Sequence, residues 1–367
     1  MKHTVVVAGL GSRGKIHVKG ILENPGRFEL AGVYDPSAEA VNKTIERFNI
    51  TCPVFSSAEE MLAKTKPEIL VFVTHPEIRM EYIKLGIKYK VKGISFEKPM
   101  AVSLSDAREM AALCRENGIK AIISHQQKYM KQMQQMYKCV RSGIIGEPEL
   151  IRIFMRPWAS QLGTHFVDYA LWANGGVGAE WVVGHAHGRV KLTDDHPSPD
   201  YLFGEARLKN GATLIIESGY LAPFTMSDEE FWCNNRLTVY GQHGYAWAET
   251  NGRCAVFSPE TKGKVELYQY PKFTVQQEDT QTPYYTEYAD WMDNDGRKHS
   301  CNIDISLEGF EIIEGLYKSA LENIRVDIPV QGRTPDAITE LKKILPEQSY
   351  PEGFKDGGFY KNGLQVK

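Results

Sequence analysis

The feature that most constrains this chain is a short apolar run followed by three glycines near its amino terminus. Residues 5–8 read Val-Val-Val-Ala, and Gly9, Gly11 and Gly14 follow before a segment that can form a helix. A buried strand would thus lead into a glycine turn and a helix whose first N–H groups can bind a phosphate anion. Gly9 permits the tight turn, Gly11 lets the backbone approach a pyrophosphate, and Gly14 lets the helix pack closely. This order predicts a dinucleotide-binding parallel sheet.

An acidic residue at the end of the second expected strand selects the kind of dinucleotide. Residues 28–34 form a strand-like run that ends at Asp35, and this lies about twenty residues beyond the last glycine. A carboxylate there accepts hydrogen bonds from the ribose hydroxyls of NAD and repels the 2′-phosphate of NADP. Residues 36–38 supply no arginine for such a phosphate. The sequence therefore predicts NAD(H) as the cofactor, with Ser12 and Arg13 of the glycine turn among its ligands.

Strand-like and helix-like segments alternate through the first part of the chain, as a parallel sheet requires. Further buried strands are expected at residues 69–74, 93–96 and 121–124. Ligands of doubly wound sheets lie at the carboxyl ends of the strands. Several residues at that edge are therefore expected to contact the cofactor: Thr74, His75, Pro76, Glu97, Lys98 and Gln126.

Composition and charge narrow the classes of protein. The chain has 367 residues, which favours two domains, and its net charge of −3 gives no basic field for nucleic acid. No apolar run reaches the length of a membrane span. The chain passes from Met1 directly into the first strand without a signal-peptide pattern, and its six cysteines form no CxxC motif. These features predict a cytoplasmic protein with reduced thiols and with neither nucleic-acid nor membrane partners.

A Glu-Lys-Pro motif at residues 97–99 follows the expected strand at residues 93–96. Its position after a dinucleotide fingerprint resembles the signature of the Gfo/Idh/MocA oxidoreductases, a family that includes glucose–fructose oxidoreductase and inositol dehydrogenase. The resemblance covers most of the chain and rests on the glycine turn and on Asp35, Thr74 with Glu81, and residues 97–101, 125–129, 142–147 and 163–168. It implies an α/β fold with an N-terminal Rossmann doubly wound parallel sheet and a C-terminal α+β domain with a large, mainly antiparallel open sheet.

Three parts of the chain are expected. Residues 1–124 would form the NAD-binding Rossmann domain, residues 125–330 the substrate-binding and oligomerisation domain, and residues 331–367 a C-terminal extension. Alternating segments predict the strands of the large sheet, at residues 181–189, 201–208, 213–220, 236–240 and 244–249. Family members associate back to back through such a sheet, so the resemblance implies a homo-oligomer.

Lys98 is the first candidate for catalysis. An ammonium at a strand end beside the nicotinamide pocket can hydrogen-bond a substrate hydroxyl and favour its alkoxide. Burial and a cationic ring nearby would both lower the pKa of such an amine. Pro99 would fix the turn and so aim the side chain. A surface salt bridge is the commoner use of a lysine, and it is the family resemblance that implies the catalytic role.

An imidazole and a carboxylate share one face of a helix expected at residues 164–173. His165 and Asp168 stand at positions i and i+3, so their side chains lie side by side. The resemblance implies that His165 takes the proton of the alcohol being oxidised, for which an ordinary pKa near neutrality is suited. Asp168 would bind substrate hydroxyls or hold His165. A purely structural hydrogen-bond network at the start of the helix is the alternative role for this pair.

Gln161 departs from the family pattern, which commonly has an aspartate four residues before the histidine. An amide can hydrogen-bond, but it cannot stabilise an imidazolium by negative charge. Either Asp168 takes that role or the substrate sits differently from a polyol. Two further departures are Lys128, where an arginine is frequent, and Arg79, where a histidine is frequent. The residues expected to line the substrate pocket are Lys98, Tyr129, Trp158, Gln161, His165 and Asp168, and no metal is expected.

The leading interpretation is an NAD-dependent oxidoreductase. It would transfer a hydride between nicotinamide and a carbinol carbon of a sugar, polyol or glycoside, with C3 of a pyranoside as one option. One alternative is an NAD-dependent glycoside hydrolase or lyase that acts by transient oxidation of the sugar. Another is a noncatalytic, NAD-sensing binding protein, against which the presence of both Lys98 and His165 argues. Net formation of NADH would favour the dehydrogenase over the hydrolase.

Overall fold

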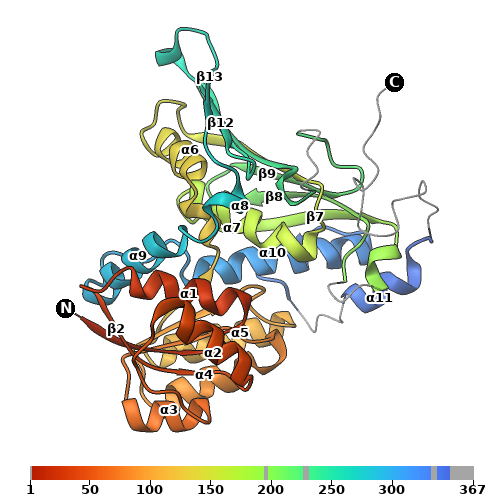
Figure 1. Ribbon diagram of the computed structural model, residues 1–367. Helices are drawn as coiled ribbons and strands as arrows, with labels where there is room; N and C mark the ends of the chain where they lie inside the picture. Colours follow the sequence, from red (N-terminus) through yellow and green to blue (C-terminus); the bar gives the residue numbers. More distant parts are fainter. Residues whose placement is uncertain (1, 194–196, 226–230, 332–336, 348–367) are drawn as a thin grey trace, which may run out of the picture. The chain divides into compact units, whose positions relative to one another are not determined.

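The computed structural model describes residues 2–193, 197–225, 231–331 and 337–347. They divide into two units (Figure 1). The first unit is formed by Met1–Tyr129 with Gln276–Leu307, and the second by Met130–Val275 with Glu308–Lys367. Each unit is built on one sheet.

A five-stranded sheet in the order β2-β1-β3-β4-β5 forms the centre of the first unit. Its strands are β1 (His3–Ala8), β2 (Phe28–Tyr34), β3 (Ile69–Phe72), β4 (Gly93–Glu97) and β5 (Lys120–Ser124). Its helices are α1 (Ser12–Leu22), α2 (Ala38–Phe48), α3 (Ala58–Thr65), α4 (Arg79–Lys88), α5 (Leu104–Glu116) and α9 (Gln281–Asp293). All paired neighbours run parallel, which confirms the doubly wound Rossmann sheet. The strand order reverses between β1 and β3, so the switch point lies at the carboxyl ends of these two strands.

Helix α9 joins the first unit although eight of the nine strands of the second sheet precede it in the chain. Three fully buried tyrosines of this helix, Tyr284, Tyr285 and Tyr288, enter the apolar core of the parallel sheet. Their hydroxyls have polar partners there, including Ser95 Oγ at 3.2 Å from Tyr284 and the carbonyl of Lys120 at 2.7 Å from Tyr288. Buried phenols are stable only with such partners. This packing explains why residues 276–307 group with the first unit. The sequence had predicted them to be part of the substrate-binding domain at residues 125–330.

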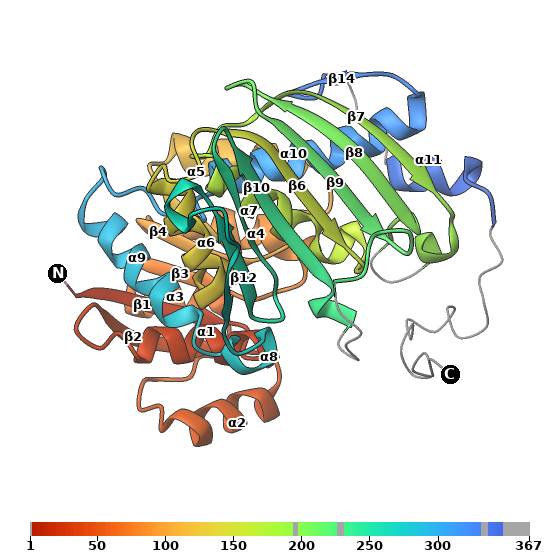
Figure 2. The ribbon, with the colours of Figure 1, turned by 90° about the horizontal axis from the view of Figure 1, so that it is seen from above.

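The second unit contains a nine-stranded sheet in the order β13-β12-β11-β10-β6-β9-β8-β7-β14 (Figure 2). Its strands are β6 (Pro148–Met155), β7 (Ala179–His187), β8 (Tyr201–Leu208), β9 (Thr213–Gly219), β10 (Asn235–Gly241), β11 (Gly244–Ala248), β12 (Arg253–Phe257), β13 (Glu266–Gln269) and β14 (Val326–Asp327). The strands β6 and β9 pair in parallel, and the other neighbours pair antiparallel. The large, mainly antiparallel sheet is therefore confirmed.

Helices cover one face of this second sheet. They are α6 (Lys131–Arg141), α7 (Thr164–Ala173) and the part of α10 (Ile303–Glu322) that belongs to this unit. Close approach of α10 requires small residues beneath it, since a Cβ on Gly184 would lie 2.4 Å from the carbonyl oxygen of Leu316. Side chains on the opposite face alternate with the buried ones and are partly exposed, as in Arg152 and Phe154 of β6. The sheet thus has one covered and one open face.

The remaining helices are short. They are α8 (Phe273–Gln276) and α11 (Ala337–Ile344), and α11 buries Ala337 and Leu341. Helix α11 is the described part of the expected extension, whose residues 332–336 and 348–367 lie outside the described ranges. Within those ranges, every helix is too short or too polar to cross a lipid bilayer.

Candidate functional site

The glycine turn between β1 and α1 has a backbone that side chains would obstruct. Gly9 has a φ of +93°, and a Cβ there would lie 2.2 Å from the carbonyl oxygen of Val73. A Cβ on Gly14 would lie 2.1 Å from the carbonyl oxygen of Gly9, whereas one on Gly11 would meet nothing within 4 Å. The turn is therefore packed against the end of β3 on one side and open at Gly11, the N-cap of α1. Such an open helix N-terminus is suited to a pyrophosphate.

The Asp35 carboxylate lies beside this turn at the end of β2. Its Oδ2 accepts a hydrogen bond of 2.6 Å from the backbone N–H of Leu10, and its Oδ1 accepts one of 2.8 Å from Ser37. Each oxygen keeps a lone pair that these bonds do not use. The carboxylate is thus held in place while it can still accept hydrogen bonds from a ribose.

At the end of β3, the Thr74 hydroxyl is buried and has no hydrogen-bond partner among the described residues. A buried hydroxyl without a partner costs about 1–3 kcal/mol. His75 next to it is exposed, and Pro76 opens a short 3-10 turn. The unused Thr74 hydroxyl and the open backbone at Gly11 both fit a dinucleotide that lies across the switch point, so the residues present suit NAD.

The Glu97 carboxylate at the end of β4 is buried and bound from two sides. Its Oε1 accepts hydrogen bonds from Arg13 Nε at 2.9 Å and from His17 Nε2 at 3.1 Å. Burial would raise the pKa of Glu97, but Arg13 and His17 more than offset this and hold the pKa well below its usual range. Burial lowers the pKa of His17, whose Nδ1 lies 2.7 Å from the Tyr285 hydroxyl. A neutral imidazole therefore bridges α9 to an ionised Glu97.

Lys98 follows this carboxylate and is half-buried. Burial lowers the pKa of Lys98, as do the positive charges of Arg13 and Arg79, while Glu97 acts in the opposite direction. The peptide bond between Lys98 and Pro99 is cis. The amine thus lies in a mixed field of one carboxylate and two guanidinium groups.

Two predicted site residues follow β5. Gln126 is buried, and the amide orientation that suits its neighbours lets its oxygen accept a bond of 2.8 Å from Arg13 Nη2. The Tyr129 hydroxyl donates to Glu287 Oε2 at 2.5 Å and lies 3.1 Å from Ser300 Oγ. Burial raises the pKa of Tyr129 well above its ordinary value, so this hydroxyl stays protonated. The structure therefore gives the predicted substrate ligand Tyr129 partners within its own unit.

His165 and Asp168 lie in the second unit, on the fully buried first turns of α7. Nδ1 of His165 is 3.0 Å from the hydroxyl of Tyr169, which follows one turn later on the same helix. If Nδ1 carries the proton and donates it to the Tyr169 oxygen, Nε2 becomes the basic nitrogen. The tautomer of His165 is thus linked to Tyr169. Sequence reasoning missed Tyr169, although a residue four positions after His165 lies on the same helix face.

Gln161 and Trp158 precede α7. Gln161 is half-buried on a π-helical turn at Ala159–Gly163, a conformation that is frequent at functional sites. The Trp158 ring is buried and lies 4.5 Å from the ammonium of Lys191, a cation–π contact. These two residues belong to the same unit as His165 and Asp168, whereas Lys98 and the predicted cofactor ligands belong to the first unit.

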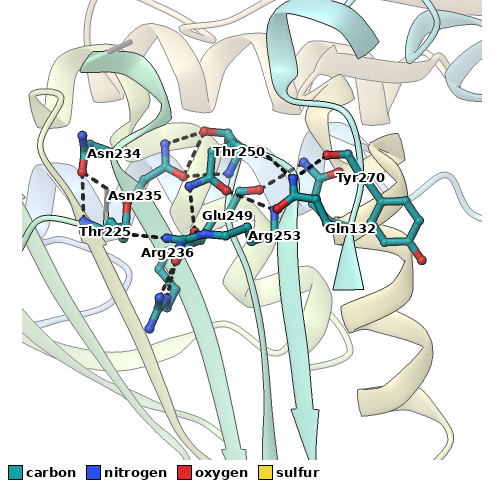
Figure 3. Close-up of polar contacts among 11 residues, drawn as sticks. Gln132, Thr225, Asn234, Asn235, Arg236, Glu249, Thr250, Arg253 and Tyr270 are labelled. Carbon is teal, nitrogen blue, oxygen red and sulfur yellow. Dashed lines mark hydrogen bonds and ion pairs between the residues drawn. The ribbon is translucent and has the colours of Figure 1, made fainter. Parts of the chain in front are cut away.

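A second polar cluster in the same unit has no free binding capacity (Figure 3). Glu249 is fully buried, and its carboxylate accepts hydrogen bonds of 2.7 Å from each of Arg236 Nε, Arg253 Nε and Asn251 Nδ2. Gln132 of α6 donates to the Glu249 carbonyl at 3.1 Å. Because both carboxylate oxygens are bound by protein donors, we interpret the cluster as a structural network that fixes the ends of β10, β11 and β12. In the described ranges, no group of three or more His, Cys, Asp or Glu residues could hold a metal ion.

The first unit thus combines a glycine turn, a carboxylate at the end of β2 and a switch point, an arrangement typical of an NAD-binding Rossmann domain. Residues 3–125 match the family model described as "Oxidoreductase family, NAD-binding Rossmann fold". These residues match the Gfo/Idh/MocA oxidoreductases, the family that the Glu-Lys-Pro motif indicated. NAD is the cofactor of this family, which confirms the prediction.

Two of the curated relatives each match less than half of the chain. An uncharacterised oxidoreductase of Streptococcus pneumoniae is 24% identical over 156 residues, which are 42% of this chain and 41% of that protein. The D-apiose dehydrogenase of Paraburkholderia graminis is 23% identical over 155 residues, which are 42% of this chain and 40% of that protein. Each match spans less than half the length of the relative.

Solved structures share the fold over most of the chain. A levoglucosan dehydrogenase in complex with NADH and levoglucosan superposes with a TM-score of 0.75 at 14% identity, over 90% of this chain and 100% of that one. A super-repressor mutant of Gal80p from Saccharomyces cerevisiae superposes with a TM-score of 0.74 at 16% identity, over 89% of this chain and 98% of that one. At these identities the similarity establishes the fold alone. The activity has to be inferred from the residues of the candidate site.

Proposed function

We propose that this protein is an NAD-dependent oxidoreductase that acts on a carbinol carbon of a sugar, polyol or glycoside. The observation that carries the proposal is the half-buried Lys98 amine, which directly follows a carboxylate bound by Arg13 of the glycine turn. An amine next to a carboxylate that binds the glycine turn is suited to donate a hydrogen bond to a substrate hydroxyl beside the nicotinamide. The levoglucosan and D-apiose dehydrogenases among its relatives support a sugar as the substrate class.

In this proposal the protein residues handle the hydroxyl group. The Lys98 ammonium donates a hydrogen bond to the substrate oxygen and stabilises its developing negative charge. His165 accepts the hydroxyl proton at Nε2, with Nδ1 directed to Tyr169. Asp168 binds a neighbouring hydroxyl or holds His165, and Gln161 and Trp158 line the sugar. Bound NAD supplies the acceptor for the hydride that leaves the carbinol carbon.

A substrate panel tests the proposal. The full chain is incubated with NAD⁺ and sugars, polyols, glycosides and sugar acids, and NADH absorbance is followed together with product analysis. A dehydrogenase forms one NADH for each carbonyl formed. Cleavage of a glycoside with no net NADH would assign the protein to the hydrolase or lyase class instead. NADH binding without any turnover on the panel would oppose the enzymatic proposal.

That last outcome would favour a noncatalytic, NAD-sensing binding protein. The candidate is kept because the fold is shared with Gal80p, which is described as a transcriptional regulator and has a super-repressor form. Sensing needs the glycine turn and Asp35, but it needs no amine or imidazole at the substrate. A sensor would therefore keep its NAD affinity and its partner binding in variants of Lys98 or His165.

Asp35 is expected to set the preference for NAD over NADP. Asp35→Asn keeps one oxygen that can accept from Leu10 but removes the charge that repels a 2′-phosphate. The ratio of the NADPH to the NADH dissociation constants, measured by fluorescence titration, should fall at least about tenfold. The exposed acid Glu39 on α2 provides the control, since Glu39→Gln should leave this ratio unchanged. An unchanged ratio in Asp35→Asn would remove Asp35 from cofactor selection.

We further propose that the open face of the nine-stranded sheet pairs with a second copy of the chain. This face is rich in rings: the guanidinium of Arg236 lies 4.1 Å from the Trp247 ring and 5.6 Å from the Phe154 ring. Ile215→Glu would put a charge on this face, at the middle of β9, and should weaken the oligomer at least about tenfold in sedimentation velocity. The control is Val102→Glu, which places the same charge on the first unit at a residue that is 62% exposed. This variant should leave the oligomer intact. A monomeric wild-type chain would refute the proposal.

A further inference from the structure

Arg79, at the start of α4, connects two loops at the carboxyl edge of the parallel sheet. Its Nε and Nη2 donate to the carbonyl of Thr74 at 3.2 and 2.9 Å. The same Nη2 donates to the carbonyl of Lys98 at 3.4 Å, and Nη1 donates to the carbonyl of Pro99. One guanidinium therefore binds the loop after β3 and the turn after β4. Both segments carry predicted site residues.

The environment of this guanidinium is unusual for a charged group. Arg79 is 2% exposed, and its guanidinium donates to backbone carbonyl oxygens; it forms no ion pair among the described residues. Burial lowers the pKa of Arg79 to about 10, while the charges of Glu97 and Glu77 oppose the shift. A buried cation without a carboxylate partner costs free energy. A residue retained under this cost needs a role that a smaller or neutral side chain would not perform.

The shape of the side chain indicates that role. A guanidinium presents five N–H donors in a rigid fork, whereas an imidazole has two nitrogens. Three carbonyls on two separate segments can thus be held by one arginine, and a lysine would have neither the fork nor the spread of its donors. The histidine that is frequent at this position in the family resemblance could not bridge the same set.

We propose that Arg79 is a positioning residue, which clamps the turn of Lys98 and Pro99 to the loop of Thr74 and sets the charge around the Lys98 amine. The inference rests on the proposed function, in which Lys98 acts on the substrate hydroxyl. Its two parts, the clamp and the charge, have different consequences and can be separated by substitution.

The electrostatic part has a defined sign. Burial comes first among the effects that lower the pKa of Lys98, the positive charges of Arg13 and Arg79 add to it, and Glu97 opposes them. Removal of the Arg79 charge should therefore raise the pKa of Lys98 and reduce the fraction of neutral amine at a given pH. Replacement of Arg79 by lysine keeps a positive charge as long as the new amine stays protonated, and should change that fraction less than a neutral substitution does.

The charge is tested by pH-dependent acetylation of Lys98, read by mass spectrometry on the full chain without substrate. Arg79→Gln should lower the neutral, reactive fraction at pH 8 at least about twofold, and Arg79→Lys should lower it less. If Arg79→Gln does not fold, Arg79→His takes its place, because an ordinary imidazole is mostly uncharged at pH 8. Equal acetylation in the wild type and in a folded neutral variant would overturn the electrostatic part.

The clamp is tested by hydrogen exchange in peptides that contain residues 74–78 and 98–103. Because lysine and glutamine both lack the fork, both variants should exchange faster in these two segments and not in β5. Unchanged exchange would overturn the clamp. The readouts need no turnover, so they stay separate from the proposed function: retained turnover in Lys98→Ala would refute catalysis by Lys98 and leave the Arg79 results standing.

Discussion

Replacement of Lys98 by alanine is expected to lower kcat for sugar oxidation at least about a thousandfold. The amine is the polar group that follows the buried strand β4 and, in our proposal, the donor that stabilises negative charge on the substrate oxygen. NADH binding should change less than about threefold, because the glycine turn, Asp35 and the Arg13–Glu97 contact remain. Steady-state kinetics on the substrate found in the panel and fluorescence titration with NADH measure the two quantities.

A matched substitution controls for the loss of a lysine next to β4. Lys92 is exposed just before β4, and its ammonium pairs with Glu68 at 2.6 Å. Such surface pairs contribute little to stability, about 0–1 kcal/mol, and Lys92→Ala should keep full activity. Lys98→Arg restores the charge with a different reach and shape, and should recover little of the rate. If Lys98→Ala keeps more than about a tenth of the wild-type kcat, the amine does not stabilise the transition state.

The pH dependence of the reaction should carry the signature of this charge field. In our proposal the protonated Lys98 is the active form, so the oxidation rate falls as pH rises through its pKa. Because burial and two arginines lower that pKa, the basic limb should begin below the ordinary value for lysine. Arg79→Gln should move the basic limb to higher pH, because it removes a positive charge that lowers the pKa of Lys98. Removal of the negative charge of Glu97 would move the limb to lower pH.

The parts of the fold that the sequence predicted well are those determined by local patterns. The first strand, the glycine turn and α1 follow from a few consecutive residues, and α7 has the predicted bounds of residues 164–173. Helix α9 escaped prediction because its stability depends on distant partners. Its tyrosines place hydroxyls on Ser95, His17 and Lys120 of the parallel-sheet unit, contacts that no sequence period reveals.

The same division applies to the candidate site. Gly9 and Asp35 could be identified from spacing, because a tight turn and a strand end are local features. The partners of Glu97 could not, since Arg13 and His17 are 84 and 80 residues away in the chain. Arg79 was noted only as a departure from a resemblance, and its contact with Pro99 required the folded backbone. Sequence thus indicated the residues of the chemistry, and the structure supplied those that orient them.

Replacement of His165 by asparagine is the second change with a large expected effect. The asparagine amide can still meet the Tyr169 hydroxyl, which lies 3.0 Å from Nδ1 in the native helix, but it cannot take a proton as Nε2 does. We expect kcat for oxidation to fall about a hundred- to ten-thousandfold. We expect the variant to fold, because asparagine remains polar at this buried position, although its side chain is smaller than that of histidine.

The pH profile separates this role from a structural one. In the wild type, oxidation should slow on the acidic limb of the profile, where a protonated imidazole can no longer take the hydroxyl proton. His165→Asn should lose that acidic limb together with its rate. Tyr169→Phe removes the partner of Nδ1 while it keeps the base, so it should move the limb and retain far more activity. A variant without His165 that still shows the wild-type limb would assign the titration to another group.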